Sequence, residues 1–467
     1  MSEQPNDTLL TLFKQALVGN STIDYTQGSI ARATFLLAVP MIIEMAMESI
    51  FAIVDIFFVS GVGTDAVATV GLTEAVITLL YALAMGLSMG TTALVARRIG
   101  EKNPAAATVT AAQALWLAAF MSLLVGISGI LFGADILRLM GAEAEVVETG
   151  RTYTTIMFGS SFTIFFLFLN NAIFRGAGDA SLAMRTLVLA NVINIVLDPC
   201  LIYGVGPFPE LGVTGAAVAT NIGRGCGVMV GLVYLCTGNN RICLLWSHTA
   251  MQARVLWTIL RISFGGVAQM LIATASWVFL MRIVSEFGGS AVAGYTIAVR
   301  IMLFIILPAF GLSNATATLV GQNLGANLPD RAEATVWKVM QYVSVYMLAT
   351  ALAALIFNEW LIALFSTEPE VMEYGVACLQ IFSFGLLFFG LSGTAVQAFN
   401  GAGDTMTPTW INFFAFWIVQ VPLAYALALF GGLGPEGVFW AVFVSDVLAG
   451  ILGVLFFRRG RWKNKRV

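Results

Sequence analysis

The sequence predicts an all-α integral membrane protein with about twelve transmembrane helices in two parallel six-helix repeats. Of the 467 residues, 59% are hydrophobic and only 10% are charged, whereas a soluble protein of this size carries roughly 25% charged residues. Long apolar runs follow one another along the chain, and segments of the first half recur in the second. Such a surface requires lipid rather than water around it.

Twelve apolar runs are long enough for the roughly 20 residues that a membrane-spanning helix needs. Several, such as residues 30–60 and 66–96, exceed that length, which predicts tilt or projection beyond the bilayer. The approximate centres of the runs in the first half are Met45, Leu80, Phe120, Ile164, Ile195 and Met229. Those in the second half are Phe279, Phe304, Leu348, Phe384, Val419 and Leu448.

Basic residues are concentrated in the loops on one side of this twelve-span arrangement. The loops on the opposite side hold fewer of them, together with several acids between residues 143 and 148 and between 368 and 373. Cytoplasmic loops carry the excess of Lys and Arg, so we expect a multi-pass protein of the plasma (inner) membrane with both termini in the cytoplasm. The basic side includes Arg97, Arg98, Lys102, Arg175, Arg185, Arg241, Arg254, Arg261, Arg331, Lys338 and Arg458 to Arg466.

An internal repeat relates the two halves. The segment GLSMGTTALVARRIGEKNP, starting at Gly86, aligns without gaps with GLSNATATLVGQNLGANLP, starting at Gly311. FRGAGD, starting at Phe174, aligns with FNGAGD, starting at Phe399, again 225 residues later. Because that offset spans six helices, both halves have the same orientation, which predicts a parallel repeat about an axis along the membrane normal.

The repeat and the charge pattern together divide the chain into five segments. We expect a cytoplasmic N-terminal segment over residues 1–29 and a basic cytoplasmic tail over 458–467. Between them we expect an N-lobe over 30–240, a cytoplasmic linker over 241–254 and a C-lobe over 255–457. Two packed bundles of this kind are a recurrent transporter plan, in which one bundle rocks against the other.

Several function classes are disfavoured by what the sequence lacks. The single histidine, His248, lies in a polar loop, and the five cysteines form no C-x-x-C pair. A transition-metal site or a Ser-His-Asp triad is therefore not expected. No GxxxxGK[ST] motif and no basic stripe occurs. We expect neither an enzyme, nor a cofactor, nor a nucleic-acid partner.

Three carboxylates and a proline mark the first span. A charge in the bilayer costs at least ~2.5 kcal/mol on insertion scales and therefore indicates function. At about 100° per residue, Glu48 lies about 40° and Asp55 about 20° from Glu44 around the helix, so the three share one narrow face. Pro40 lies beside that face and permits a bend. We interpret the face as a polar stripe toward an internal cavity; packing against neighbouring helices is the alternative.

The fifth span carries a second polar face. Asn191, Asn194 and Asp198 follow the i, i+3, i+7 spacing that places side chains on one side of a helix. Pro199 directly follows Asp198 and predicts a locally opened helix with carbonyls free for a cation. Asp55 and Asp198 both fall in the outer half of their spans, which suits a proton or sodium site. An interhelical hydrogen-bond cluster is the alternative.

The repeat predicts that these carboxylates are confined to the first half. One bundle would then bind the driving ion, and the other would mainly move against it. Three further charged residues in the spans, Glu74, Arg224 and Arg300, are interpreted as partners of buried acids. In the second half, the residues equivalent to Glu44, Glu48, Asp55 and Asp198 are Gln269, Ala273, Leu280 and Val421.

These features resemble the multidrug and toxic compound extrusion (MATE) transporters over nearly the whole chain. The resemblance implies a cation site made of Asp55, Asn194 and Asp198, with Thr220 as fourth member and Thr214 as its rival. The acids are placed as in the DinF-like branch; the NorM-like branch would add acids to the seventh and tenth spans. The motifs that carry the resemblance are Pro40 with Asp55, Asn194-x-x-x-Asp198, GAGD at Gly176 and Gly401, and GVTGAAVAT at Gly212.

By this resemblance we expect a secondary active exporter that antiports organic compounds against H⁺ or Na⁺ by alternating access. The expected substrates are amphipathic and often cationic, and the expected state is a monomer in membrane lipid. Glu44 and Glu48 lie outside the family motif, and their helix face alone suggests that they admit a cationic drug or a proton. A lipid-linked oligosaccharide or lipid flippase of the wider superfamily is the alternative.

Overall fold

The computed structural model describes residues 8–19, 23–141, 144–237, 241–244 and 250–465. These parts of the chain are helical and contain no strand. The helices of the first half are α1 (Leu9–Val18), α2 (Ile30–Ser60), α3 (Thr64–Gly100), α4 (Pro104–Leu139), α5 (Ala144–Gly159), α6 (Ser161–Ala177), α7 (Ala180–Ile202) and α8 (Val213–Cys236). Those of the second half are α9 (Ala253–Ser285), α10 (Gly289–Gly325), α11 (Pro329–Ile356), α12 (Asn358–Ala363), α13 (Pro369–Gly401), α14 (Met406–Asn412), α15 (Val421–Tyr425) and α16 (Pro435–Arg458).

The prediction of about twelve spans is confirmed. Eleven helical segments among the described residues are long and apolar enough to cross a membrane. The 31-residue α2, which carries the three acids, is a twelfth helix of that length and runs alongside α7 and α10. Two spans are composite: α5 and α6 meet at Ser160, and residues 406–430 run from α14 through π-helical turns and α15. Each predicted centre falls in its own span.

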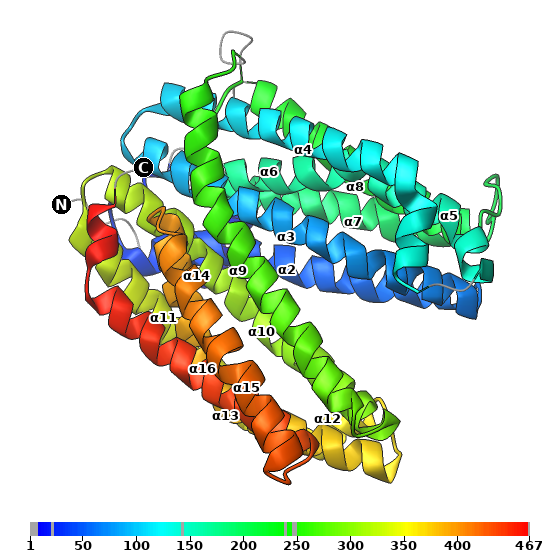
Figure 1. The fold of residues 1–467 in the computed structure, drawn as a ribbon. Helices are drawn as coiled ribbons and strands as arrows, with labels where there is room; N and C mark the ends of the chain where they lie inside the picture. The colour runs from blue at the N-terminus through cyan, green and yellow to red at the C-terminus, as the bar shows by residue number, and fades with distance from the viewer. Residues whose placement is uncertain (1–7, 20–22, 142–143, 238–240, 245–249, 466–467) are drawn as a thin grey trace.

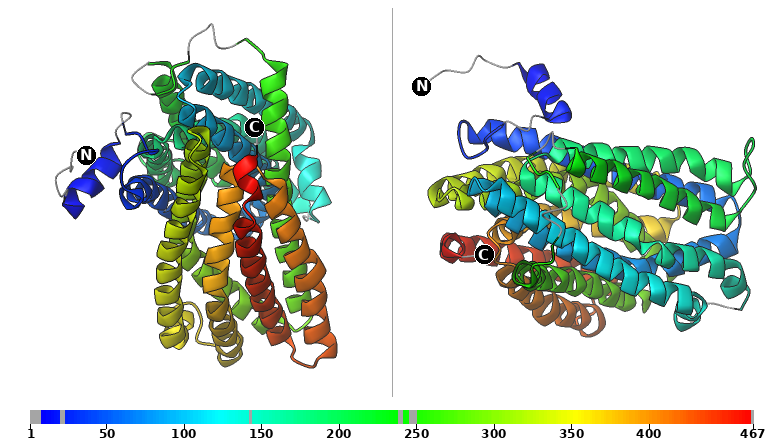
Figure 2. Two further views of the ribbon diagram at one scale, coloured as in Figure 1. Left: turned by 90° about the vertical axis from the view of Figure 1, so that its left-hand side faces the viewer. Right: turned by 90° about the horizontal axis from the view of Figure 1, so that it is seen from above.

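Figure 1 shows the two bundles that the repeat predicts. We call α2 to α8 the N-lobe and α9 to α16 the C-lobe. The two lobes lie together at the end of the molecule where both termini are marked, and their helices diverge toward the opposite end (Figures 1 and 2). A chain that crosses the membrane an even number of times must have both termini on the same side, as is seen here.

The backbone repeats as the sequence does. Lys102 and Asn327 are the two described non-glycine residues with positive φ, at 56° and 58°, and they are 225 residues apart. The GAGD glycines Gly178 and Gly403, at the same offset, take φ of 87° and 79°. Any side chain would be strained at these two glycines, since the left-handed region favours a residue without a Cβ. The two copies of each motif therefore build the same turn.

Reciprocal contacts between the lobes follow the same offset. A Cβ added at Gly86 would lie 2.7 Å from Val267 Cα, and one added at Gly311 would lie 2.7 Å from Ile42 Cα. Gly86 and Gly311 are equivalent in the repeat, and so are Ile42 and Val267. The missing side chains thus allow α3 to approach α9, and α10 to approach α2, equally closely. These contacts lie in the half of the molecule nearer the termini.

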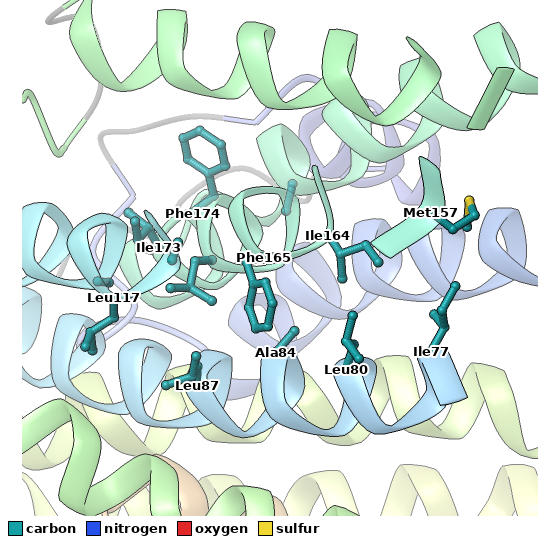
Figure 3. Close-up of a cluster of buried hydrophobic side chains, with 14 of the residues drawn as sticks. Ile77, Leu80, Ala84, Leu87, Leu117, Met157, Ile164, Phe165, Ile173 and Phe174 are labelled. Carbon is teal, nitrogen blue, oxygen red and sulfur yellow. The ribbon is translucent and has the colours of Figure 1, made fainter. Parts of the chain in front are cut away.

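The N-lobe core is built largely by α3 and α6. Ile77, Leu80, Ala84 and Leu87 recur at helical spacing along α3 and pack against buried residues of α6 such as Phe165 (Figure 3). In a bilayer this packing is driven by van der Waals contact, because lipid is as apolar as leucine. The core holds α6 rigidly against α3 and so positions the polar side chains that α6 contributes.

Candidate functional site

The predicted stripe on α2 separates into two different environments. Glu44 is buried, and its Oε1 accepts hydrogen bonds from Arg175 Nη1 at 2.7 Å and Asn171 Nδ2 at 3.3 Å, both from α6. A charge-assisted bond of that length is among the strong ones. Glu44 Oε2 has no described partner. Glu44 is therefore a buried half of an ion pair between α2 and α6.

Glu48, one turn further along α2, is much less firmly held. Asn191 Nδ2 of α7 donates to its Oε2 at 3.4 Å, and Arg224 Nη2 of α8 lies 4.0 Å from its Oε1. The side chain keeps 37% of its surface exposed, against 3% for Glu44. Glu48 is thus a carboxylate that faces α7 and α8 inside the N-lobe and is still accessible.

A compact polar cluster lies where α7 and α8 cross. Asn194 Nδ2 donates to Asp198 Oδ1 at 3.2 Å and to Thr220 Oγ1 at 3.1 Å. Asp55 of α2 lies within electrostatic reach of Asp198. All four side chains are buried, with 6% or less of their surface exposed. The structure therefore brings Asn194, Asp198 and Thr220 into contact and places Asp55 within electrostatic reach of Asp198; these are the four residues that the resemblance implied.

Three acceptor oxygens of this cluster are buried without a hydrogen-bond partner. They are Asp55 Oδ1, Asn194 Oδ1 and Asp198 Oδ2. Buried polar atoms are normally satisfied, and an exception needs an explanation such as an ion. Hard cations take oxygen ligands, and a proton on one carboxyl group would supply a donor. The chemistry of the donor set therefore fits a proton or a small hard cation.

Thr220 and its rival Thr214 can be distinguished by their positions. Thr220 lies beside Asn194 and is 5% exposed. Thr214, in the first turn of α8, makes no hydrogen bond to a residue of the cluster in the described structure. Of the two hydroxyl groups, the one at Thr220 belongs to the cluster geometrically.

Pro199 does not open the fifth span. We expected carbonyls to be released next to Asp198, but α7 continues as an α-helix through Pro199 to Ile202. A proline in a helix removes one backbone hydrogen bond without necessarily unwinding the turn. The unpaired acceptors established at the cluster are side-chain oxygens, those of Asp55, Asn194 and Asp198. Pro40 is likewise accommodated within α2.

The confinement of carboxylates to the first half is wrong. Asp446 lies in α16, the last span, partly buried and without an ion pair to any described residue. The repeat sets Asp446 against Asn221, so comparing only the positions of the first-half acids does not include it. A scan of every span for charged residues would have found it.

The three other charged residues in the spans behave differently from one another. Arg224 lies beside Glu48, an acid of the polar stripe on α2, as the predicted pairing with an acid requires. Glu74 is exposed on α3 and interacts electrostatically with Arg224. Arg300 is exposed on α10 and forms no ion pair with a described residue, so the pairing expected for it is absent from the described structure.

Comparison with known proteins decides the family. The MatE family model matches residues 40–200 and 267–426, most of the chain and one block in each lobe. This chain is a member of the MatE family. The match includes most of α2 and α7, so Asp55, Asn194 and Asp198 lie inside the matched part, whereas Thr220 of α8 lies outside it.

Similar MatE proteins are known both as sequences and as structures. The "Probable multidrug resistance protein YoeA" of Bacillus subtilis is 28% identical and covers 95% of this chain and 96% of its own. The "Probable multidrug resistance protein NorM" of Thermotoga maritima is 27% identical over 92% and 93%. A structure described as the outward-facing conformation of a multidrug resistance MATE family transporter of the MOP superfamily is 27% identical, with a TM-score of 0.88 over 94% and 98%.

Membership confirms the predicted class and fold. The chain is a multi-pass membrane protein of a family of multidrug efflux transporters, built as two six-helix repeats. The sequence placed it in this family from the polar motifs of two spans and the offset of the repeat.

Proposed function

We propose that this MatE protein is a secondary active exporter that antiports organic compounds against H⁺ or Na⁺. The coupling ion binds at Asp55, Asn194, Asp198 and Thr220. The observation that carries the proposal is the set of three buried acceptor oxygens, one each on Asp55, Asn194 and Asp198, that lack a partner. Such a set is costly to bury empty and is stabilised by a bound proton or cation.

Transport proceeds by alternating access between the two lobes. The end of the molecule that carries the termini is cytoplasmic, because basic residues crowd its loops, and the protein is held in the inner membrane. There, Gln322 Nε2 and Thr318 Oγ1 of α10 each donate at 3.0 Å to carbonyls of Gly176 and Arg175 at the end of α6. These contacts, with the reciprocal glycine contacts, close the cytoplasmic side and break when the lobes rock.

Coupling follows from which state each ligand prefers. A ligand shifts a two-state equilibrium only by its difference in affinity for the two states. An ion that enters from outside neutralises Asp55 and Asp198, which favours release of substrate outward, and the ion leaves after the lobes reset. The substrates are amphipathic and often cationic organic compounds, because Glu48 presents an accessible carboxylate inside the N-lobe. The exporter works as a monomer without a bound cofactor.

Purified protein in proteoliposomes tests this function. Efflux of a fluorescent organic cation should be driven by an imposed proton gradient or an imposed sodium gradient, applied separately. Thr220→Val should weaken coupling, because it removes a hydroxyl group beside Asn194. Thr214→Val, the same change six residues earlier in α8, is the matched control and should transport normally. Absence of efflux under both gradients would contradict the proposal.

A further inference from the structure

Arg224 lies in the N-lobe beside Glu48 and Tyr81, and only its contact with the carboxylate is long. Its side chain is 8% exposed, and its nearest carboxylate oxygen, Glu48 Oε1, lies 4.0 Å away. The other ion pair of α2, between Arg175 and Glu44, has a separation of 2.7 Å. The guanidinium of Arg224 is thus beside Glu48 without the short, directed contact that would fix it there.

Two aromatic rings lie beside this guanidinium, and one of them, Tyr81, also shares a side-chain hydrogen bond with it. Arg224 Cζ lies 5.3 Å from the ring centroid of Phe51 and 5.5 Å from that of Tyr81. Both distances fall within the ~6 Å over which an aromatic ring attracts a cation. A carboxylate with two aromatic rings is the kind of site that recognises organic cations such as quaternary ammonium groups.

The charge of Arg224 also acts on other acids of the lobe. Asp55 and Glu74 both interact with it electrostatically. Within this group, Arg224 is the one basic side chain among three carboxylates, those of Glu48, Asp55 and Glu74. The Arg224 guanidinium therefore already occupies the space beside Glu48 and the two rings, which is the space that a cationic ligand would prefer.

We propose that Arg224 is a tethered cation that occupies the site for the cationic group of the substrate, and that a substrate binds by displacing it from Glu48. This inference rests on the proposed export function and names its substrate class: monovalent aromatic or quaternary organic cations. Arg224 thereby determines specificity, because a ligand must compete with it for Glu48, Phe51 and Tyr81. Neutral and anionic compounds gain nothing from that exchange.

Equilibrium binding to the full-length protein in detergent tests the competition without requiring transport. Ethidium, a planar aromatic cation, is the probe, and its fluorescence reports binding. Arg224→Met keeps an unbranched side chain and removes the charge, so ethidium affinity should rise about tenfold, the order of effect expected when one close charge pair is changed. Arg224→Lys should bind like the wild type. Arg300→Met, which removes a positive charge from the exposed surface of α10, is the matched control and should leave the affinity unchanged.

A double-mutant cycle separates competition from a general charge effect. Glu48→Gln should weaken ethidium binding about tenfold, and adding Arg224→Met to Glu48→Gln should give no further gain. Arg224→Gln serves as the second variant, with the same expected direction, if thermal unfolding shows that Arg224→Met is not folded. Fluorescein, an anionic dye of similar size, should bind no more tightly to any Arg224 variant.

The outcomes distinguish this inference from the function on which it rests. If the wild type binds ethidium but the folded Arg224 variants bind it equally or more weakly, the tethered-cation role is overturned and the exporter proposal stands. The same holds if loss of Arg224 weakens fluorescein binding, since Arg224 would then anchor anions. If the wild type binds no organic cation at all, export of this substrate class is itself overturned.

Discussion

Glu44 and Glu48 are one helical turn apart on α2, yet they contribute to the molecule in different ways. Glu44 is closed off by a short ion pair with Arg175, whereas Glu48 shares a long contact with Arg224 and remains accessible. Removing one partner of a buried pair leaves an uncompensated charge, which costs about 3–5 kcal/mol. A partly exposed pair is worth roughly 0–1 kcal/mol. Two chemically identical residues are thus expected to differ in stability and in function.

This difference can be measured by replacing each glutamate with glutamine. Glu44→Gln should lower the free energy of unfolding by about 3 kcal/mol, because Arg175 is left without its counter-ion. Glu48→Gln should lower it less, because the contact with Arg224 is 4.0 Å long and Asp55 still acts on Arg224, and it should instead reduce substrate binding. Thermal unfolding in detergent compares the two variants. Equal destabilisation by both would contradict the separate roles.

Asp55 is the residue on which coupling is expected to depend. Asp55→Asn removes the charge with little change in volume, so the protein should fold and insert while gradient-driven efflux is abolished. Asp198→Asn should act similarly, since both substitutions preserve the shape of the side chain and hence the packing. Leu280→Asp introduces an acid at the position equivalent to Asp55. It should not restore function, because the C-lobe has Val421 at the position equivalent to Asp198 and so offers no partner carboxylate. Efflux is measured against surface-matched expression, and wild-type efflux by Asp55→Asn would refute the site.

The site was largely predictable at this scale, whereas the specific pairing of each basic side chain with its acid was not. Helical periodicity fixes which side chains of one helix share a face, so Asp55, Asn194 and Asp198 could be selected from spacing and motif. The partners Arg175 and Arg224 come from helices more than a hundred residues away, and only the packed lobes determine their distances to Glu44 and Glu48. For the same reason no pattern in the sequence indicates that Glu44 is enclosed and Glu48 accessible.

At the scale of helices, the contact between the lobes depends on glycines at equivalent positions of the two repeats. Gly86 and Gly311 allow close approach at equivalent points, each against backbone atoms of the other lobe. Backbone cannot give way as the end of a flexible side chain can. The spans were predictable from apolar length, but the break between α5 and α6 and the π-helical turns of residues 406–430 were not. Such irregularities depend on neighbouring helices that restore backbone hydrogen bonds.

Gly86→Ala and Gly311→Ala should therefore disfavour this arrangement of the lobes. A methyl group at either position collides with the facing helix, so the equilibrium should shift toward the state in which the lobes separate at the end carrying the termini. Ser263→Cys, which faces Gly90 in this interface, should then react faster with a thiol reagent. Gly225→Ala is the matched control, because nothing lies within 4 Å of its added Cβ. An unchanged labelling rate in both variants would contradict the role of these contacts.

At the scale of the whole molecule, the two lobes share one fold but differ in the polar side chains buried between their helices. In the C-lobe, Ser276 Oγ donates to Gln420 Oε1 at 2.7 Å, and Gln420 Nε2 donates to Ser445 Oγ at 2.8 Å. Ser445 is equivalent to Thr220 in the repeat, but this chain of hydrogen bonds is neutral and connected. The N-lobe cluster instead keeps three unpaired acceptors. Duplication thus preserved the helical frame, while the polar side chains between the helices differ between the copies.

The orientation of this frame in the membrane is the last prediction. Both termini lie at the end where the lobes meet, and the basic loops are at that end, so it should face the cytoplasm. In a variant whose native cysteines are replaced, Arg138→Cys, at the exposed end of α4, should react with a membrane-impermeant maleimide in intact cells. Glu101→Cys, at the other end of α3 and α4, should react only after permeabilisation. The reverse pattern would place the closed side outside, and the structure would then represent the inward-facing state of the exporter.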